Sequence, residues 1–198
     1  MEKNHYLLKI TLGPASFKRF AEFNARYIQR KFTRPLMIGG AGFLGSLISF
    51  ASQNSFDEAF AIGTILFVIA FLVPMNFFST FNKTVKEQTA RMQIEKPRHV
   101  YTIELEGKSD GIRYYHAGEK KMAGQFSWKS ITGVWRASKA IYLYVEPERA
   151  LLIPEGTKDV NLDQLWKFFC RQAGEEKCHD FRSKEETPLL KLVDKLHI

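Results

Sequence analysis

The spacing of three glycines, Gly40, Gly42 and Gly45, is the pattern in this chain that is most similar to a known cofactor-binding motif. A Gly-x-Gly-x-x-Gly run after a strand lets the backbone approach a pyrophosphate, which then lies at the N-terminus of the next helix. That chemistry also needs an amphipathic helix after the glycines and an acidic residue about 20 positions further on. The spacing therefore predicts a nucleotide site only where these elements accompany it.

The surroundings of the glycines do not fit a nucleotide site. The string MIGGAGFLGS resembles the cofactor turn of extended short-chain dehydrogenases, but the position about 20 residues on falls in a second apolar run. The residues that follow, SLISFASQ, have no charged face, and the Tyr-x-x-x-Lys pattern at Tyr27 to Lys31 precedes the glycines. A nucleotide-cofactor enzyme is thus the remote alternative, and helix packing is the favoured interpretation of the glycines.

The other residue types that carry out catalysis or bind metals are scattered. There is no His-Glu-x-x-His and no Gly-x-Ser-x-Gly pattern. Cys170 and Cys178 form no Cys-x-x-Cys pair, so two isolated thiols in a reducing compartment are expected. We predict a protein that is not an enzyme, with no catalytic residue, no cofactor and no metal site. The histidines lie in separate segments: His5, His99, His116, His179 and His197.

Four basic residues are candidate lipid-headgroup contacts. Lys108 and Arg113 flank one predicted hairpin turn, and Lys120 and Lys121 lie at the next. Lysine and arginine side chains donate charge-assisted hydrogen bonds to phosphate. An ordinary solvated basic surface is the alternative interpretation.

Two uncharged stretches predict a transmembrane hairpin at residues 35–81. No charged residue lies between Pro35 and Phe56 or between Ala59 and Asn82, and each stretch exceeds the ~20 residues that cross a bilayer. We predict spans at about residues 36–53 and 59–81. Neither span contains an ionisable group, which argues against a transporter.

Basic residues flank this hairpin, and its connecting turn has none, so both termini are predicted to face the cytoplasm of a bacterium. This arrangement predicts a multi-pass integral protein of the cytoplasmic membrane, whose spans contact the membrane lipids. It also accounts for much of the net charge of +8, so nucleic acid is not an expected partner.

Small residues form a stripe on each predicted span. Such stripes let two helix backbones approach closely. Intramolecular packing is the favoured use, and a homodimer is the alternative. The predicted helix-packing residues are Gly39, Gly42, Ser46, Ser49, Gly63 and Ala70.

The rest of the chain predicts cytoplasmic segments. Residues 1–34 predict a strand at 6–12 and a basic amphipathic helix at 16–32, which either lies on the membrane or packs on the following domain. Alternating apolar residues from His99 onward predict an antiparallel sheet of at least five strands, closed by a helix with Asn161 as N-cap. The remaining segments are a basic connector at 82–98 and a polar tail at 175–198, whose end predicts a short amphipathic helix from Thr187.

A bent sheet plugged by a C-terminal helix is the plan of a pleckstrin-homology-like domain, predicted at 99–174. The order of Asp110-Gly111-Ile112, the run from Phe126 to Val134, Ile141 to Tyr144 and Leu152-Ile153-Pro154 resembles the YcxB-like family of bacterial membrane proteins. That resemblance implies the same domain order and fold, and it implies no reaction. The predicted fold class is an α+β membrane protein with a two-helix transmembrane hairpin and this cytoplasmic domain.

The leading functional hypothesis is a non-enzymatic, membrane-anchored binding or regulatory module. Its pleckstrin-homology-like domain is expected at the cytoplasmic membrane surface, with a protein partner bound there or at the helix of residues 187–198. The alternative is a self-protection (immunity-type) membrane protein that acts against a toxin or bacteriocin.

Overall fold

The computed structural model describes residues 4–29, 33–53, 58–107, 111–147 and 149–182. The chain divides into two compact units. The sheet unit takes the N-terminal residues up to Ser16 and the chain from Gln93 onward. The helical unit runs from Phe17 to Met92.

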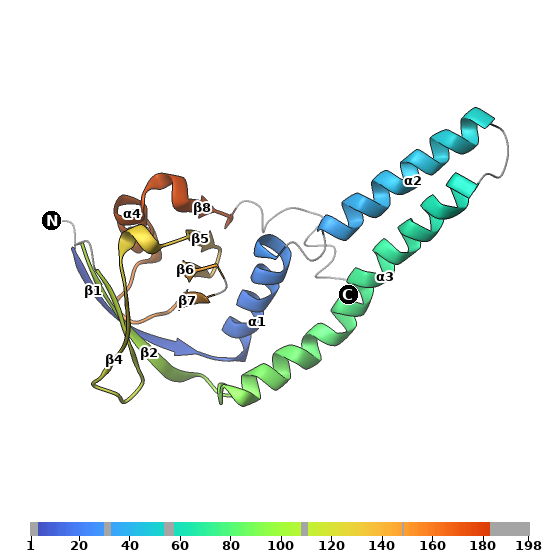
Figure 1. Ribbon diagram of the computed structural model, residues 1–198. Helices are drawn as coiled ribbons and strands as arrows, with labels where there is room; N and C mark the ends of the chain where they lie inside the picture. Colours follow the sequence, from blue (N-terminus) through green and yellow to red (C-terminus); the bar gives the residue numbers. More distant parts are fainter. Residues whose placement is uncertain (1–3, 30–32, 54–57, 108–110, 148, 183–198) are drawn as a thin grey trace. The chain divides into compact units, whose positions relative to one another are not determined.

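The helical unit consists mainly of two long helices. Helix α1 (Pro14–Phe23) leads into the π-helix η1 (Asn24–Ile28). Helices α2 (Thr33–Gln53) and α3 (Glu58–Arg91) then pack side by side and antiparallel (Figure 1). We call α2 and α3 together the helical hairpin.

The first sheet of the sheet unit joins distant parts of the chain. Its antiparallel strands are β1 (His5–Leu12), β2 (Arg98–Glu106), β3 (Ile112–His116) and β4 (Met122–Phe126), in that spatial order. Side chains of β1 alternate strictly between exposed and buried, as a strand with one face on a core requires. The strand predicted at residues 6–12 is confirmed as β1. It pairs with β2, although the whole helical unit lies between these two strands in the sequence.

The second sheet has the strand order β7-β6-β5-β8. Strands β5 (Gly133–Ala137), β6 (Ala140–Glu146) and β7 (Arg149–Pro154) form an antiparallel meander. The short strand β8 (Cys178–Asp180) returns from the C-terminal part of the chain and pairs parallel with β5.

Helix α4 (Leu162–Ala173) supplies aromatic side chains to the core of the sheet unit and contacts β5, β6 and β8. The Asn161 side chain accepts hydrogen bonds from the backbone N–H groups of Asp163 and Gln164, so the predicted N-cap is confirmed. Phe168 and Phe169 are fully buried. Trp166, on the same helix, is only half-buried.

Two 3-10 turns complete the sheet unit. In η2 (Trp128–Ser130), Trp128 packs edge-on against Phe168, and its ring N–H donates to the Glu106 carbonyl at 2.8 Å. The turn η3 (Glu175–Lys177) connects α4 to β8. A tryptophan N–H that finds a partner inside the core removes the cost of burying it.

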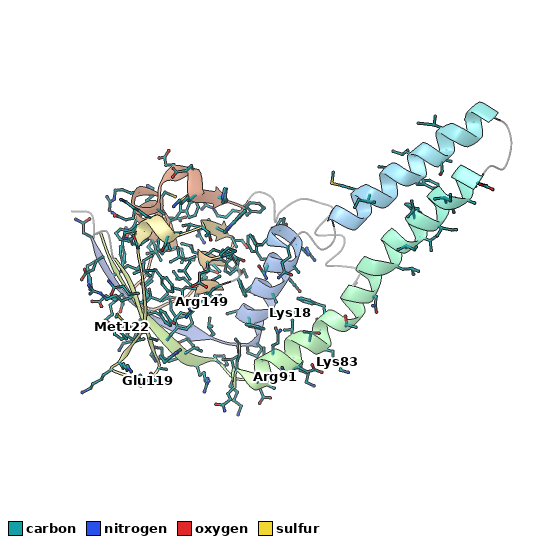
Figure 2. All side chains as sticks on the ribbon, viewed as in Figure 1. Lys18, Lys83, Arg91, Glu119, Met122 and Arg149 are labelled. Atoms are coloured by element: carbon teal, nitrogen blue, oxygen red, sulfur yellow. The ribbon has the colours of Figure 1, made fainter. Side chains whose placement is uncertain are left out.

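Hydrogen bonds also connect the two sheets. The Tyr101 hydroxyl on β2 donates to the carbonyl of Leu152 on β7 and accepts from its N–H, both at 2.8 Å. Burial raises the pKa of Tyr101, so this hydroxyl keeps its proton and both bonds. Arg149 on β7 donates to the Tyr114 hydroxyl on β3 and lies over the Phe126 ring (Figure 2).

The predicted transmembrane hairpin is wrong. In the part of the chain that the structure describes, no helix has the length and the apolar content needed to cross a membrane. The prediction counted uncharged residues, whereas crossing requires sustained apolar content. Helix α2 is diluted by glycines and by Ser46, which lowers its apolar content.

Several other predictions depended on the spans and are corrected with them. An integral association with membrane lipids, a multi-pass topology with both termini cytoplasmic, and a location in the bacterial cytoplasmic membrane all required a spanning helix. The predicted fold class is wrong for the same reason. The described chain is an α+β fold with two four-stranded sheets and the helical hairpin, and its sheets take β1 and β8 from outside residues 99–174.

The two helices of the hairpin approach most closely at a glycine. A Cβ atom added to Gly63 on α3 would stand 2.8 Å from the Gly42 carbonyl oxygen and would overlap the Ser46 side chain. Real Cβ atoms do not tolerate such contacts, so the backbones can pack here only because Gly63 has no side chain. Gly40, by contrast, has no neighbouring atom within 4 Å of the same added Cβ.

These two glycines give a matched pair of substitutions. Gly63→Ala should destabilise the helical hairpin by about 1–3 kcal/mol, because the added methyl group forces α2 and α3 apart. Gly40→Ala should stabilise it by ~1 kcal/mol, because alanine is the better helix former and nothing opposes its methyl group. Amide hydrogen exchange along α2 and α3 measures both. Equal effects of the two substitutions would contradict the close approach at Gly63.

Candidate functional site

The structure does not bring the predicted lipid-contacting residues together. Lys108 lies outside the described residues. Lys120 and Lys121 are exposed at the turn between β3 and β4, where Figure 2 labels Glu119 and Met122. Arg113 lies near the other end of β3 and is paired with carboxylates of β2. The four residues therefore do not form one basic site.

The partners of Arg113 belong to a polar cluster on the outer face of the first sheet. The Arg113 guanidinium lies 3.7 Å from Glu104 and 3.6 Å from Glu106, measured from Nη1 to a carboxylate oxygen. His5 Nε2 lies 3.3 Å from Glu104 Oε1, and the Tyr115 hydroxyl donates to Glu104 Oε2 at 3.1 Å. We call these five residues the outer-face cluster.

Three members of the outer-face cluster have the types and spacing of metal ligands. One ligand atom each from His5, Glu104 and Glu106 lies within 4.8 Å of the others. Arg113 already pairs with both carboxylates, and a cation placed there would have to displace it. The geometry is therefore that of an ion-pair network, and it carries no metal site.

This network changes the acid strength of Glu104. The hydrogen bond from His5 is the largest cause that holds the Glu104 pKa below its ordinary value of 4.5. Burial opposes this with the second-largest effect, and the hydrogen bond from Tyr115 and the charge of Arg113 each lower the pKa by a smaller amount. Glu104 is thus a carboxylate over a wider acid range than a free glutamate.

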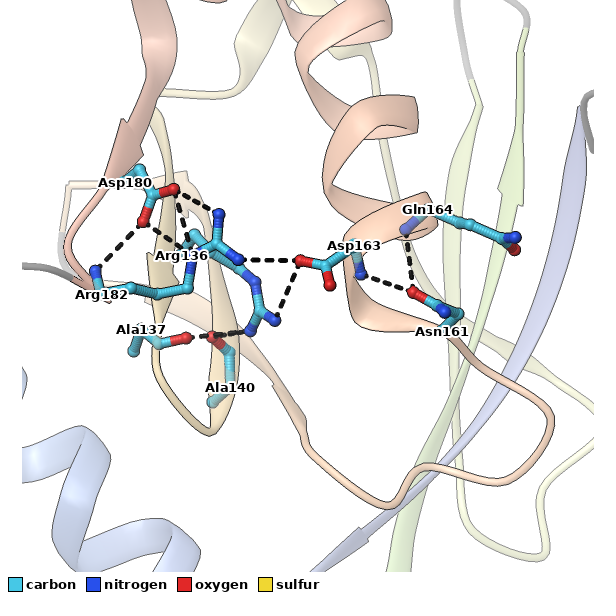
Figure 3. A network of polar contacts seen from close by, with 8 residues as sticks. All are labelled: Arg136, Ala137, Ala140, Asn161, Asp163, Gln164, Asp180 and Arg182. Carbon is cyan, nitrogen blue, oxygen red and sulfur yellow. Dashed lines mark hydrogen bonds and ion pairs between the residues drawn. The ribbon is translucent and has the colours of Figure 1, made fainter.

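A second polar network fixes the start of helix α4 (Figure 3). The Arg136 side chain, 6% exposed, donates from Nη1 to the carbonyl of Ala137 at 2.9 Å, and its Nη2 lies 3.5 Å from Asp163. Asp163 also receives Arg182 Nη1 at 2.9 Å, and Arg182 pairs with Asp180 at 2.7 Å. These contacts tie β5, α4 and β8 together, so we assign this network a structural role.

Arg182 also affects the titration of its partner. Its hydrogen bonds to Asp180 are the largest cause that lowers the pKa of that carboxyl, ahead of the opposing effect of burial. The charge of Arg136 contributes in the same direction. Asp180 therefore stays ionised to a lower pH than a free aspartate and keeps its ion pair with Arg182 over that range.

The glycine-rich string lies inside a helix. Gly40, Gly42 and Gly45 all belong to α2, and the described residues around them contain neither the strand nor the tight turn of a pyrophosphate-binding loop. Gly39 is buried, and Gly42 faces Leu66 of α3 with 3.6 Å between an added Cβ and Leu66 Cδ1. The side chains of Ser49 and Ala70 lie outside those described.

The helical hairpin has its small residues inside and its large apolar residues outside. Gly42, Ser46 and Gly63 form the contact between the helices, and Phe43 packs on Phe67 with 4.7 Å between ring centroids. Side chains project outward from both helices (Figure 2). The large apolar ones, between 38% and 72% exposed, are Met37, Ile38, Leu44, Leu47, Ile48, Ile62, Ile65, Leu66, Phe67, Val68, Ile69 and Leu72.

We call these large exposed residues the hairpin surface. Monomeric proteins rarely expose apolar patches larger than a few hundred Å², and larger ones mark interaction sites. The transmembrane prediction placed these residues in lipid, and no binding site was predicted there. A signal for them was available, because large apolar residues flank the small-residue stripe of each helix.

No protein-family model, curated protein or solved structure matches the chain. The resemblance to the YcxB-like family stays a prediction. The hairpin surface is therefore chosen as the candidate functional site on physical grounds alone.

The outer-face cluster predicts how acid affects stability. Because the Glu104 pKa is lower in the folded chain, its stabilising contribution is complete above about pH 4.5 and is lost as the pH falls through the folded value. Glu104→Gln should lower the urea midpoint at pH 7 and leave it nearly unchanged at pH 2. Glu119→Gln, which removes an exposed carboxylate at the β3–β4 turn, is the control. An equal loss at both pH values would contradict the assignment.

Proposed function

We propose that this protein is a non-enzymatic binding module that associates with a second copy of itself through the hairpin surface. The observation that carries the proposal is the number of large apolar side chains left exposed on α2 and α3. Exposed apolar area is the main source of free energy in protein association.

The size of the hairpin surface suits a dimer. Summed over all sides of both helices, its exposed fractions correspond to roughly 1,000 Å² on each copy, and a standard interface buries about 800 Å² per partner. A second copy offers the same area and the same helix length. A two-fold axis would place each patch on its own equivalent.

The charge distribution also favours a second copy. Within the described parts of α2 and α3, no charged residue lies between Met37 and Gln53 or between Phe60 and Asn82, so two identical surfaces do not repel each other. The small residues already lie in the contact between α2 and α3. The large side chains are therefore free to interlock with those of another hairpin, as in four-helix bundles.

The enzyme and self-protection alternatives gain no support from the described chain. The outer-face cluster and the Arg136 network are ion-pair networks with structural explanations. The glycine-rich string is helical. The self-protection alternative stays a prediction, whereas the hairpin surface supports self-association.

Sedimentation velocity of the full chain in reducing, detergent-free buffer tests the proposal. The wild-type chain should be a dimer at micromolar concentration. The double variant Ile48→Asp and Ile65→Asp places one carboxylate on each helix of the hairpin surface, and burying these charges should weaken dimerisation at least about 100-fold. The matched control, Gln88→Asp on the polar end of α3, should dimerise as the wild type does.

Other outcomes would overturn the proposal. A wild-type chain that is monomeric at all concentrations, or one that forms only open-ended aggregates, would do so. A double variant that still dimerises would show that the copies meet elsewhere. Binding of the wild-type chain to neutral phosphatidylcholine vesicles without a dimer in buffer would assign the hairpin surface to a different occupant.

A further inference from the structure

Helix α2 has two sides that differ in what they contact. On one side, Gly42 and Ser46 lie against Gly63 of α3. On the opposite side, five apolar residues form a stripe in which every member is exposed. The stripe consists of Met37, Ala41, Leu44, Ile48 and Ala51. The hairpin contact therefore occupies one side of α2 and leaves this stripe on the other.

The spacing of the stripe is that of a helix–helix seam. Its members follow one another at intervals of four, three, four and three residues, which is the repeat of the apolar positions in a coiled coil. The large exposed residues of α3 have no such order, because Ile65 to Ile69 are five consecutive residues that point to different sides of the helix. The stripe on α2 is thus the part of the hairpin surface that defines a single line of contact.

We propose that the dimer forms by packing of α2 on α2 of the second copy, antiparallel, with the two-fold axis at Leu44. This inference rests on the proposed dimer and names the helix and the direction of its contact. Leu44 then meets Leu44 of the second copy. To within one residue, Met37 faces Ala51 and Ala41 faces Ile48, on each side of the axis.

The sizes of the side chains decide the direction. In the antiparallel arrangement, each alanine of the stripe faces a large residue, Met37 or Ile48, so the layers of the contact have similar total volume. In a parallel arrangement each residue would face its own equivalent. Ala41 and Ala51 would then face alanines, which leaves gaps between the helices that cost free energy.

The backbone beside the stripe is also open to a close neighbour. A Cβ atom added to Gly45 would have no atom of the chain within 4 Å. Two helices whose contact contains alanines, with a glycine beside it, can approach at the short end of the usual 8–10 Å range of interaxial distances. Cα atoms on the two-fold axis then come within the roughly 7 Å that a disulfide can bridge.

Cysteine cross-linking of the full chain tests this arrangement. In a background with Cys170→Ser and Cys178→Ser, Leu44→Cys should form a covalent dimer when it is oxidised with copper phenanthroline. Met37→Cys alone and Ala51→Cys alone should not, because each would lie about 21 Å along the helix from its own equivalent. A mixture of the Met37→Cys and Ala51→Cys chains should cross-link to each other. Gln88→Cys, on the polar end of α3, is the control that should stay uncoupled.

Sedimentation velocity before oxidation separates this inference from the proposed function. A background chain that is monomeric, like the wild-type chain, would overturn both. A dimeric background in which Leu44→Cys does not cross-link would overturn the contact through α2 and leave the dimer standing. Efficient cross-linking of Met37→Cys or Ala51→Cys alone would overturn the antiparallel direction.

An exchange of sizes tests the same contact without oxidation and with both native cysteines in place. Ala41→Leu overfills the layer against Ile48 of the second copy, and Ile48→Ala empties it, so each should weaken dimerisation at least about 10-fold. The double variant restores one large and one small residue to the layer and should dimerise to within about threefold of the wild type. A double variant as weak as the sum of its parts would overturn the facing of residues 41 and 48.

Discussion

The pairing of β1 with β2 is the constraint on which the rest of the fold depends. Eight residues of β1 find their partners in β2, and the whole helical unit lies between these two strands in the chain. The pairing brings Tyr6 to the core, where its ring packs edge-on against Phe168 of α4. It also sets His5 opposite Glu106, so that the outer-face cluster forms. A shift of one residue would move all these side chains to the wrong face of the sheet.

The features that the sequence predicts well are local. The alternation in residues 5–12 identifies β1, and the Asn161 cap identifies the start of α4, because both signals depend on neighbours in the chain. Contacts between residues that lie far apart in the sequence are not predictable in this way. The parallel pairing of β8 with β5 and the contact of Arg136 with Asp163 depend on a register that no single segment encodes.

The helical hairpin shows why uncharged length is an incomplete criterion. Runs without charge predicted spans, although glycines and serines dilute α2 and a basic end extends α3. The small-residue stripe was informative in another respect, because Gly42, Ser46 and Gly63 do lie where the helices touch. With small residues at the closest approach, most of the large ones remain exposed. The two helices therefore pack closely on each other, while most of their large apolar side chains stay exposed.

The separation of β1 from β2 also affects how the chain is made. The N-terminus leaves the ribosome first, but the partner strand of β1 is synthesised only after the helical unit, at Arg98 and beyond. During that interval the apolar side chains Tyr6, Leu8 and Ile10 have no core to enter. Closing so long a loop costs only slightly more conformational entropy than closing a short one. The stabilising contacts between the two strands nevertheless form only after the loop has closed. In a nascent chain, β1 therefore stays uncovered until its partner strand emerges.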